Sequence, residues 1–312
     1  RFRLVVTEAA ANGQPADSAG NPDLFVNVSV SWRRTDDQPL SKDTVIVSGK
    51  TGKPVGACRR WFSSTAELAT FSFSADDGVG DYFLYYMPFY TCEYQGGSCR
   101  YGQGAHQVYY NPLVHCNVSK TLHQPFTAAS PLSTSSVVYE SKDIFDTFSP
   151  METPMTSSEL SSFLRRANTS VVVVSEDRSV PIRMRNRLPQ MWLQRQQTST
   201  AASPRLADFA GTAAPGENYT FQLAVYASSF DVNITNVDIA DNGVFENARC
   251  MNLGGSDFWG RPLQKEPITI GAGELGVLWI ALKIPINAKT GTHTSTVTVV
   301  IVDTRTGTAQ VK

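Results

Sequence analysis

Two adjacent carboxylates followed by a cation, Glu176-Asp177-Arg178, come closest in this 312-residue chain to an acid–base pair. Two carboxylates on either side of a glycosidic bond can hydrolyse it as acid and base. The three residues follow Val171–Val174, an apolar run that predicts a strand buried on both faces. Neighbouring side chains on an extended chain point to opposite sides, and an acidic pair beside an arginine is usually a structural ion pair. We therefore assign no catalytic residue.

A glycine pattern later in the chain also has a well-known chemical use. Gly271-Ala272-Gly273-Glu274-Leu275-Gly276 fits GxGxxG, which binds dinucleotide phosphates when a helix begins directly after it. Here the strand-like run Val277–Ile284 follows, and it ends at Pro285. The context predicts a hairpin turn between two strands and no cofactor.

The cysteines allow two interpretations. They are Cys58, Cys92, Cys99, Cys116 and Cys250. Cys92 and Cys99 bracket a short loop that a hairpin disulfide can close, and Cys58 and Cys116 can form a second pair that leaves Cys250 free. The alternative is a zinc site built from the first four cysteines and His115, but no CxxC spacing supports it. We favour disulfides and predict no metal site; none of the four histidines has a partner at a recognised catalytic spacing.

Two aromatic stretches are candidates for ligand contact. In Tyr82–Tyr90 the rings can form a platform for sugars, although alternation sends half of them into a sandwich core and Pro88 ends the strand. The second stretch is a loop with an aromatic pair between opposite charges, formed by Asp257, Phe258, Trp259 and Arg261. It either packs on a neighbouring domain, which we favour, or binds a ligand.

Composition excludes several functional classes. The chain has 27 Lys plus Arg against 28 Asp plus Glu, without a basic stripe, so no nucleic-acid partner is expected. No apolar run reaches the roughly 18 residues of a membrane span. Five Asn-x-Ser/Thr triplets are present, at Asn27, Asn117, Asn168, Asn218 and Asn233. We read them as glycosylation acceptors that point to a secreted or lumenal location.

The order of elements predicts a mostly β chain: two antiparallel β-sandwich domains joined by a small α/β connector with one clear helix. Residues 1–125 read as short strands between turns, and so do residues 206–312. The connector, 126–205, holds a helix near 157–167, where Thr156 and Glu159 have the spacing of a capping box.

Several short motifs, taken in order, resemble the amino-terminal region of glycoside hydrolase family 123-like proteins. They include Gly80–Pro88, Phe148–Glu152, Glu176–Arg178, Pro181–Met184, Leu188–Trp192, Pro215–Gln222, Asp257–Arg261 and Leu278–Ile280. The resemblance runs from Phe25 to Ile301.

The resemblance implies β-sandwich modules that precede a (β/α)₈-type barrel, in which an adjacent Asp–Glu pair hydrolyses N-acetylhexosamine linkages with help from the substrate's acetamido group. Either this chain is the amino-terminal part of a longer protein, whose barrel is a missing C-terminal domain and partner beyond Lys312, or a non-catalytic version exists on its own. We expect no hydrolysis by residues 1–312 alone. The chain is then a non-catalytic accessory region of a secreted glycoside-hydrolase-like protein.

Two other functions remain open. The chain can be a glycosylated extracellular structural or adhesive protein that self-assembles through its sandwiches. It can also bind glycans itself, through Tyr85–Tyr90 or Phe258-Trp259.

Overall fold

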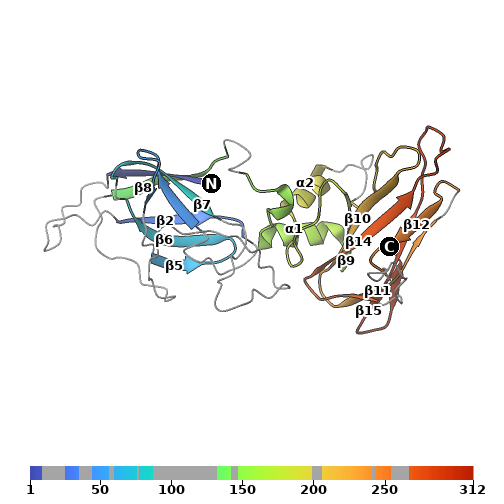
Figure 1. The fold of residues 1–312 in the computed structure, drawn as a ribbon. Helices are drawn as coiled ribbons and strands as arrows, with labels where there is room; N and C mark the ends of the chain where they lie inside the picture. Colours follow the sequence, from blue (N-terminus) through green and yellow to red (C-terminus); the bar gives the residue numbers. More distant parts are fainter. Residues whose placement is uncertain are drawn as a thin grey trace, which may run out of the picture. The chain divides into compact units, whose positions relative to one another are not determined.

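The computed structural model describes residues 1–8, 25–34, 44–55, 60–75, 77–86, 132–141, 147–198, 206–240, 243–253 and 267–311. The chain divides into two compact units, 1–149 and 150–312. Each unit is described by itself, and Figure 1 traces the chain through both.

The described residues of the first unit form two antiparallel sheets. One has the strand order β4-β3-β7-β1-β8 and the other the order β2-β6-β5. The strands are β1 (Phe2–Glu8), β2 (Phe25–Ser31), β3 (Thr44–Ser48), β4 (Pro54–Val55), β5 (Arg60–Ser64), β6 (Leu68–Ser74), β7 (Gly80–Tyr86) and β8 (Leu132–Tyr139).

Alternating side chains of these two sheets form one core, which makes the unit a β-sandwich. In β7, Tyr82, Leu84 and Tyr86 are buried, as alternation in the aromatic run predicts. They pack with residues of β1, β2, β3 and β6. Trp32, just after β2, is also fully buried and donates its indole N–H to the Thr65 carbonyl at 2.8 Å.

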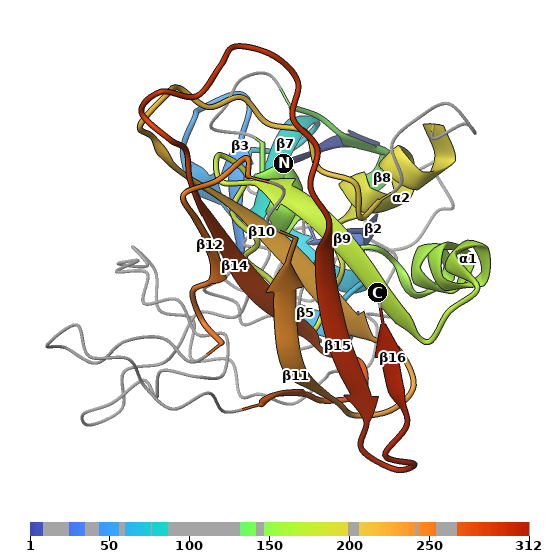
Figure 2. The ribbon, with the colours of Figure 1, turned by 90° about the vertical axis from the view of Figure 1, so that its right-hand side faces the viewer.

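The second unit also pairs two antiparallel sheets. Their orders are β12-β14-β10-β9 and β13-β11-β15-β16, and Figure 2 shows β11, β15 and β16 in front of the first of them. The strands are β9 (Val171–Asp177), β10 (Asn218–Ala227), β11 (Val232–Ile239), β12 (Asn247–Cys250), β13 (Ile268–Ile270), β14 (Leu275–Lys283), β15 (Val297–Asp303) and β16 (Ala309–Val311).

Strands β9 and β10 are covered on both faces. Phe221, Leu223 and Val225 of β10 enter the core between the two sheets, whereas Ala224 and Tyr226 enter a second core on the opposite face. The apolar run of β9 divides between the same two cores, so its predicted burial on both faces is confirmed. Both strands therefore read as apolar in sequence because each has two buried sides.

Helices form the layer over that opposite face. A short 3₁₀ turn (Pro150–Glu152), α1 (Ser157–Ala167) and α2 (Gln190–Thr198) pack on it through Met151, Phe163 and Trp192. In Figure 1 both helices lie on one side of β9 and β10, with β11 and β15 on the other. Fold class is thus mostly β, but the unit has two helices where the sequence predicts one clear helix.

Helix α1 has a complete capping box at its start. The Glu159 N–H donates to Thr156 Oγ1 at 3.3 Å, and the Thr156 N–H donates to Glu159 Oε2 at 2.8 Å. These two bonds satisfy backbone groups that the first helical turn leaves without partners. Helix α2 follows Pro189 and is rich in glutamine, with only Trp192 and Leu193 buried, so it offers little apolar periodicity to sequence analysis.

The GxGxxG stretch is a turn, but the predicted hairpin is wrong. The Glu274 N–H donates to the Gly271 carbonyl at 2.9 Å, and Gly273 has φ +77°. The flanking strands belong to different sheets, because β13 pairs with β11 and β14 pairs with β10. A Cβ on Gly276 would lie 2.4 Å from the side chain of Ile270, so glycine is needed where the chain crosses between the sheets.

The range expected as a connector, 126–205, is shared between the units. Strand β8 pairs with β1 and joins the first sandwich. Residues from Pro150 onward belong to the second unit, where they supply β9 and the helical layer.

Candidate functional site

A cluster of charged and polar side chains lies where β9 ends beside β10. Glu176 pairs in register with Gln222, and Asp177 pairs with Phe221. Because successive side chains of a strand alternate, Glu176 points to the helical layer and Asp177 to the side of Tyr219. The prediction that the two carboxylates point to opposite sides of the strand is therefore confirmed.

Glu176 is bound by two side chains of α2. It is 5% exposed, and its Oε1 accepts from the Trp192 indole N–H at 2.5 Å and from Arg195 at 3.0 Å. Arg195 also donates to the Ser175 carbonyl at 3.1 Å. A buried carboxylate is costly unless it is paired and hydrogen-bonded, and these donors meet that requirement. Glu176 thereby anchors α2 to β9.

Asp177 is bound on the other side of the strand. Hydrogen bonds from the Ser179 hydroxyl, the Tyr219 hydroxyl and the Ser179 N–H lower the pKa of Asp177 to about 2. The pKa of Tyr219 is raised to about 12. Burial is the largest cause, and the hydrogen bond that the Tyr219 hydroxyl donates to Asp177 is the next. At neutral pH the pair is a charged acceptor and a neutral donor, which is a stable arrangement and not a proton relay.

Arg178 fastens the turn before β10. Its guanidinium is 2.7 Å from Glu217 Oε1 and lies over the Tyr219 ring at 4.5 Å. Glu217 Oε2 also accepts from the Ala214 N–H at 2.8 Å, and this bond and Arg178 lower the pKa of Glu217. Gly216 occupies the turn at φ +81°, where a side chain would be strained. The Pro-Gly-Glu-x-Tyr motif is thus one hydrogen-bonded turn.

Gln222, on β10, is the member of the cluster that binds the chain segment following β9. It is 1% exposed; its Oε1 accepts from the Ile182 N–H at 3.0 Å, and its Nε2 donates to the carbonyls of Asp177 and Val180 at 3.1 and 3.3 Å. One side chain therefore pairs three backbone groups of the segment that follows β9. Such buried backbone groups need partners wherever no regular ladder supplies them.

The arrangement is suited to holding structure. Each carboxylate of the cluster has its own donors, and the two do not face a common space. Sequence reasoning found Glu176, Asp177 and Arg178 but missed the role of Gln222 and of the α2 residues. The sequence did carry a signal for Gln222, because it is an isolated polar side chain on an apolar strand. A buried residue of this kind needs hydrogen-bond partners.

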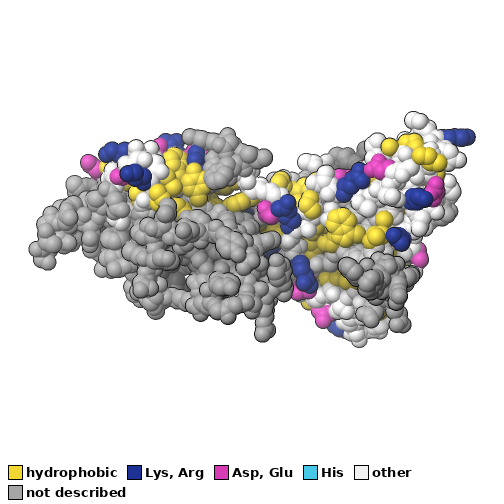
Figure 3. Space-filling view, in the orientation of Figure 1, with side chains coloured by type: hydrophobic (Ala, Val, Ile, Leu, Met, Phe, Trp, Pro, Cys, Tyr) yellow, Lys and Arg dark blue, Asp and Glu magenta, His cyan; other side chains and the backbone are white. Residues whose placement is uncertain are grey.

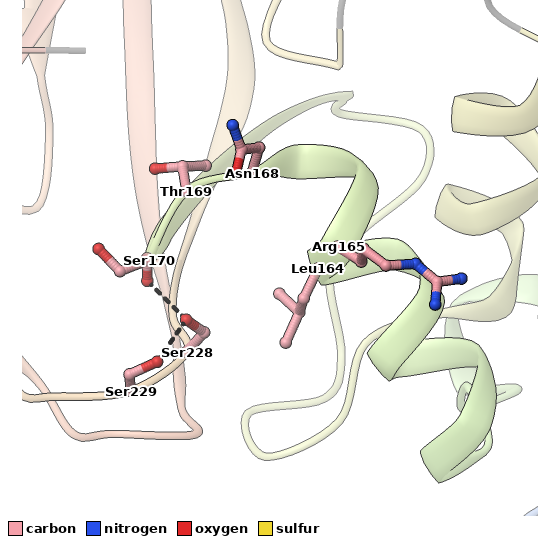
Figure 4. Close-up of a pocket in the computed structure, with 7 residues that line it drawn as sticks. All are labelled: Leu164, Arg165, Asn168, Thr169, Ser170, Ser228 and Ser229. Atoms are coloured by element: carbon pink, nitrogen blue, oxygen red, sulfur yellow. Dashed lines mark hydrogen bonds between the residues drawn. The ribbon is translucent and has the colours of Figure 1, made fainter.

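Two shallow recesses flank the helices, and neither brings an acid–base pair together. One of about 440 Å³ lies between the end of α1 and the turn after β10. In Figure 4, Ser228 and Ser229 are turned toward Ser170, whereas Arg165 points away from these serines. The Ser228 Oγ donates to the Ser170 carbonyl at 2.9 Å. The other, about 330 Å³, includes Glu159, which the capping box and Gln190 already engage.

The sequon asparagines occupy different environments. Asn27, Asn168 and Asn218 are exposed, whereas Asn233 is half-buried and its Oδ1 accepts from the Thr269 hydroxyl at 2.8 Å. Asn168 ends α1 in the left-handed region, at φ 48°. Their glycosylation stays a prediction, and Asn117 lies outside the described residues.

Several other predicted site residues also lie outside the described parts of the chain. These are Cys58, Cys92, Cys99, Cys116, Asp257, Phe258, Trp259 and Arg261. Cys250 is described; it forms no disulfide with another described cysteine, and its thiol donates to Asn252 Oδ1 at 3.5 Å.

Among the described residues no three His, Cys, Asp or Glu side chains gather in a way that could hold a metal ion. His293, which belongs to the described 267–311 segment, contacts the Lys289 carbonyl at 3.0 Å. Among the described residues, no helix has the length and apolarity needed to cross a membrane.

Comparison with known proteins identifies the first unit. Residues 3–138 match the family model described as Glycoside hydrolase 123, N-terminal domain. The N-terminal region is therefore a glycoside hydrolase 123-like region, and the resemblance seen in the sequence is confirmed there. The match ends before the Glu176 cluster, and no curated protein matches the chain.

Two solved structures with a distant likeness to this chain illustrate the comparison. One is a family 123 glycoside hydrolase from Clostridium perfringens, studied for glycolipid glycan hydrolysis. It has 15% identity, a TM-score of 0.27, and coverage of 46% of this chain and 26% of that one. The apo PCuAC domain from PmoF1 has 18% identity, a TM-score of 0.18, and coverage of 32% of this chain and 80% of that one. Neither score defines a shared fold.

Proposed function

We propose that this chain is a non-catalytic accessory region of a secreted glycoside-hydrolase-like protein. The observation that carries the proposal is the state of the Glu176–Asp177 pair. The two carboxylates point to opposite faces of β9, and each is bound by its own donors, Trp192 and Arg195 for one and Ser179 and Tyr219 for the other. Most glycosidases place two carboxyl groups on either side of one bond, about 5 to 10 Å apart, and a substrate-assisted one still needs its carboxyl groups to reach the same substrate.

The role we propose is that of a scaffold. Packed sheets with a helical layer form rigid elements, which can hold a neighbouring catalytic domain in place and shape the edge of its cleft. The catalytic domain of the same protein is the proposed partner, and N-acetylhexosaminidase chemistry would belong to that domain. The match of residues 3–138 to an N-terminal domain of glycoside hydrolases supports this association.

Extracellular location is part of the proposal. Asn27, Asn168 and Asn218 are exposed at their sequons, so an attached glycan would meet no buried neighbour. Intact mass of protein purified from its own source, before and after peptide:N-glycosidase treatment, tests this. A mass loss is expected; an unchanged mass at the value of the bare polypeptide would remove the argument for export.

Hydrolysis assays test the non-catalytic role. Chromogenic p-nitrophenyl N-acetyl-β-D-galactosaminide and glucosaminide are incubated with the folded chain, with a known hexosaminidase as positive control. We expect no release above the buffer blank. Release that scales with protein concentration and falls in Glu176→Gln or Asp177→Asn would overturn the proposal.

A further inference from the structure

The sheet β12-β14-β10-β9 leaves part of its outer face open. The helical layer covers β9 and β10 through residues such as Val174 and Tyr226. Farther along the sheet, on β14 and just after β12, Trp279 is 37% exposed and Met251 is 41% exposed. In Figure 3 hydrophobic side chains reach the surface where β10 and β14 lie in Figure 1, with basic side chains at their margin.

Strand register places an arginine on the same open face. Cys250 packs against the core between the sheets, so Arg249 and Met251 on either side of it point outward. The Met251 N–H donates to the Trp279 carbonyl at 2.7 Å, and Arg249 is in register with Ala281. Arg249 is therefore a diagonal neighbour of Trp279, with Cα atoms about 7–8 Å apart.

The Trp279–Arg249 face, defined by these two side chains with Met251 and Ala281, has unused donors. Within the described residues the Trp279 indole N–H and the Arg249 guanidinium make no hydrogen bond or ion pair. Lys283, on the same face of β14, is bound to Glu246 at 2.5 Å. On the β10 side, Arg183 is bound to Glu152 at 2.9 Å. Within the described residues, Arg249 is thus a cation without a counter-ion beside an exposed ring.

This combination suits a sugar with a carboxylate. An exposed indole stacks on the apolar face of a pyranose and offers its N–H as a donor. A guanidinium binds a carboxylate through two parallel hydrogen bonds. We propose that the Trp279–Arg249 face binds carbohydrate that carries a carboxylate, as sialic or uronic acids do. The sugar ring lies on Trp279 and the carboxylate on Arg249.

A protein partner fits the face less well. A stable protein interface buries about 800 Å² on each side around a cluster of apolar anchors. Here Trp279 and Met251 are the large apolar side chains that the described part of the face exposes. A single ring beside one cation matches the size of one or two sugar units.

The inference deepens the proposed accessory role by naming a ligand for it. Failure of sugar binding would leave the scaffold role standing, because that role is tested by hydrolysis assays. Detectable hydrolysis would overturn the scaffold role without bearing on this face.

Isothermal titration with the whole chain tests the proposal, using sialyllactose and oligogalacturonate as acidic probes and lactose as the neutral one. We expect saturable binding of at least one acidic probe, weakened by salt because the contact to Arg249 is ionic. Trp279→Ala is expected to abolish it, and Arg249→Gln to weaken it at least tenfold while leaving any lactose signal unchanged. Arg166→Gln and Ile286→Ala, both at exposed positions away from the face, are matched controls that should bind as the wild type does.

Circular dichroism and unfolding midpoints establish that each variant is folded. The proposal is overturned if the folded wild type binds neither acidic probe, or if lactose binds as tightly as sialyllactose. It is also overturned if Trp279→Ala binds unchanged. Complete displacement of the sugar by hexaglutamate, with equal affinity, would show that charge alone is recognised and would contradict the stacking contact.

Discussion

The two units differ in how the apolar faces of their β-sheets are covered. In the first unit two sheets face each other around one apolar core, and the outer faces carry no helical layer in the described residues. In the second unit the sheet β12-β14-β10-β9 is covered by a second sheet on one face and by α1 and α2 on the other. The extra layer is tied down by polar side chains, Glu176 and Gln222 among them.

The sequence motifs of the two units have correspondingly different structural roles. Motifs of the first unit, such as the aromatic run in β7, describe an alternating sandwich strand. Several described motifs of the second unit, among them Glu176–Arg178, Leu188–Trp192 and Pro215–Gln222, meet around the end of β9, where they pair backbone groups and bind the helical layer. Polar residues that look catalytic in sequence have hydrogen-bond partners within this fold, and their removal should destabilise the second unit selectively.

The largest effect is expected from Gln222→Leu. The change leaves the Ile182 N–H and the carbonyls of Asp177 and Val180 without their partner, at a cost of about 3 kcal/mol in unfolding free energy. Ser72→Ala is the contrast in the first unit, because the buried Ser72 Oγ has no hydrogen-bond partner among the described residues, and near-neutral stability is expected. Urea unfolding of both variants measures the difference. Equal costs would show that the polar network contributes nothing special.

Paired tryptophan variants sharpen the comparison further. Trp192→Phe removes a donor to the buried Glu176 carboxylate and should cost about 2–3 kcal/mol, since bonds to charged groups are the stronger ones. Trp32→Phe removes a donor to a neutral carbonyl and should cost about 1 kcal/mol beyond any packing change. Both indoles are fully buried, so the packing losses are similar. The order of the two unfolding free energies is the test, and a larger loss for Trp32→Phe would contradict it.

A smaller effect is expected at the start of α1. Thr156→Ala removes the capping oxygen that accepts from the Glu159 N–H, which costs about 1 kcal/mol. Ser161→Ala on the exposed side of the same helix is the control, and it should be neutral or slightly stabilising because alanine favours helix. Thermal unfolding followed by circular dichroism distinguishes the two. A capping variant as stable as the control would mean that α1 is held by packing alone.

The smallest effect is a dependence on pH at Asp177. Its pKa in the folded chain is about 2, below the ordinary 3.8, so its stabilising contribution is present above about pH 4 and is lost as pH falls toward 2. Tyr219→Phe removes one of the donors that lower this pKa. The difference in urea midpoint between wild type and Tyr219→Phe should therefore shrink between pH 5 and about pH 2. A difference that grows on acidification would show that Asp177 is not the acceptor.

Much of the fold could be predicted from the sequence, because it rests on local patterns. Alternation placed Tyr82, Leu84 and Tyr86 inside a sandwich, and the unbroken apolar run of β9 indicated two buried faces. Helix α2 escaped detection since its glutamines give no apolar stripe and its burial depends on contacts with β9. The crossing of the chain from β13 to β14 was read as a hairpin because local turn chemistry does not reveal which sheet each strand joins.

The candidate site was less predictable for the same reason. Glu176, Asp177 and Arg178 stand out as neighbours in sequence, but their partners Trp192, Tyr219 and Glu217 are brought to them by tertiary structure. Alternation alone predicted that the two carboxylates separate. It could not predict the donors Trp192, Arg195 and Tyr219, since these lie between 16 and 42 residues away; only Ser179 is a near neighbour of Asp177 in sequence.

The central claim, that the Glu176 cluster holds structure and does no chemistry, is tested most directly by a double-mutant cycle between Glu176→Gln and Trp192→Phe. The measurement is the unfolding free energy of the wild type, both single variants and the double variant at neutral pH. Because the indole N–H donates to the carboxylate at 2.5 Å, we predict a coupling energy of at least about 1 kcal/mol. Additive losses, with no coupling, would contradict the account.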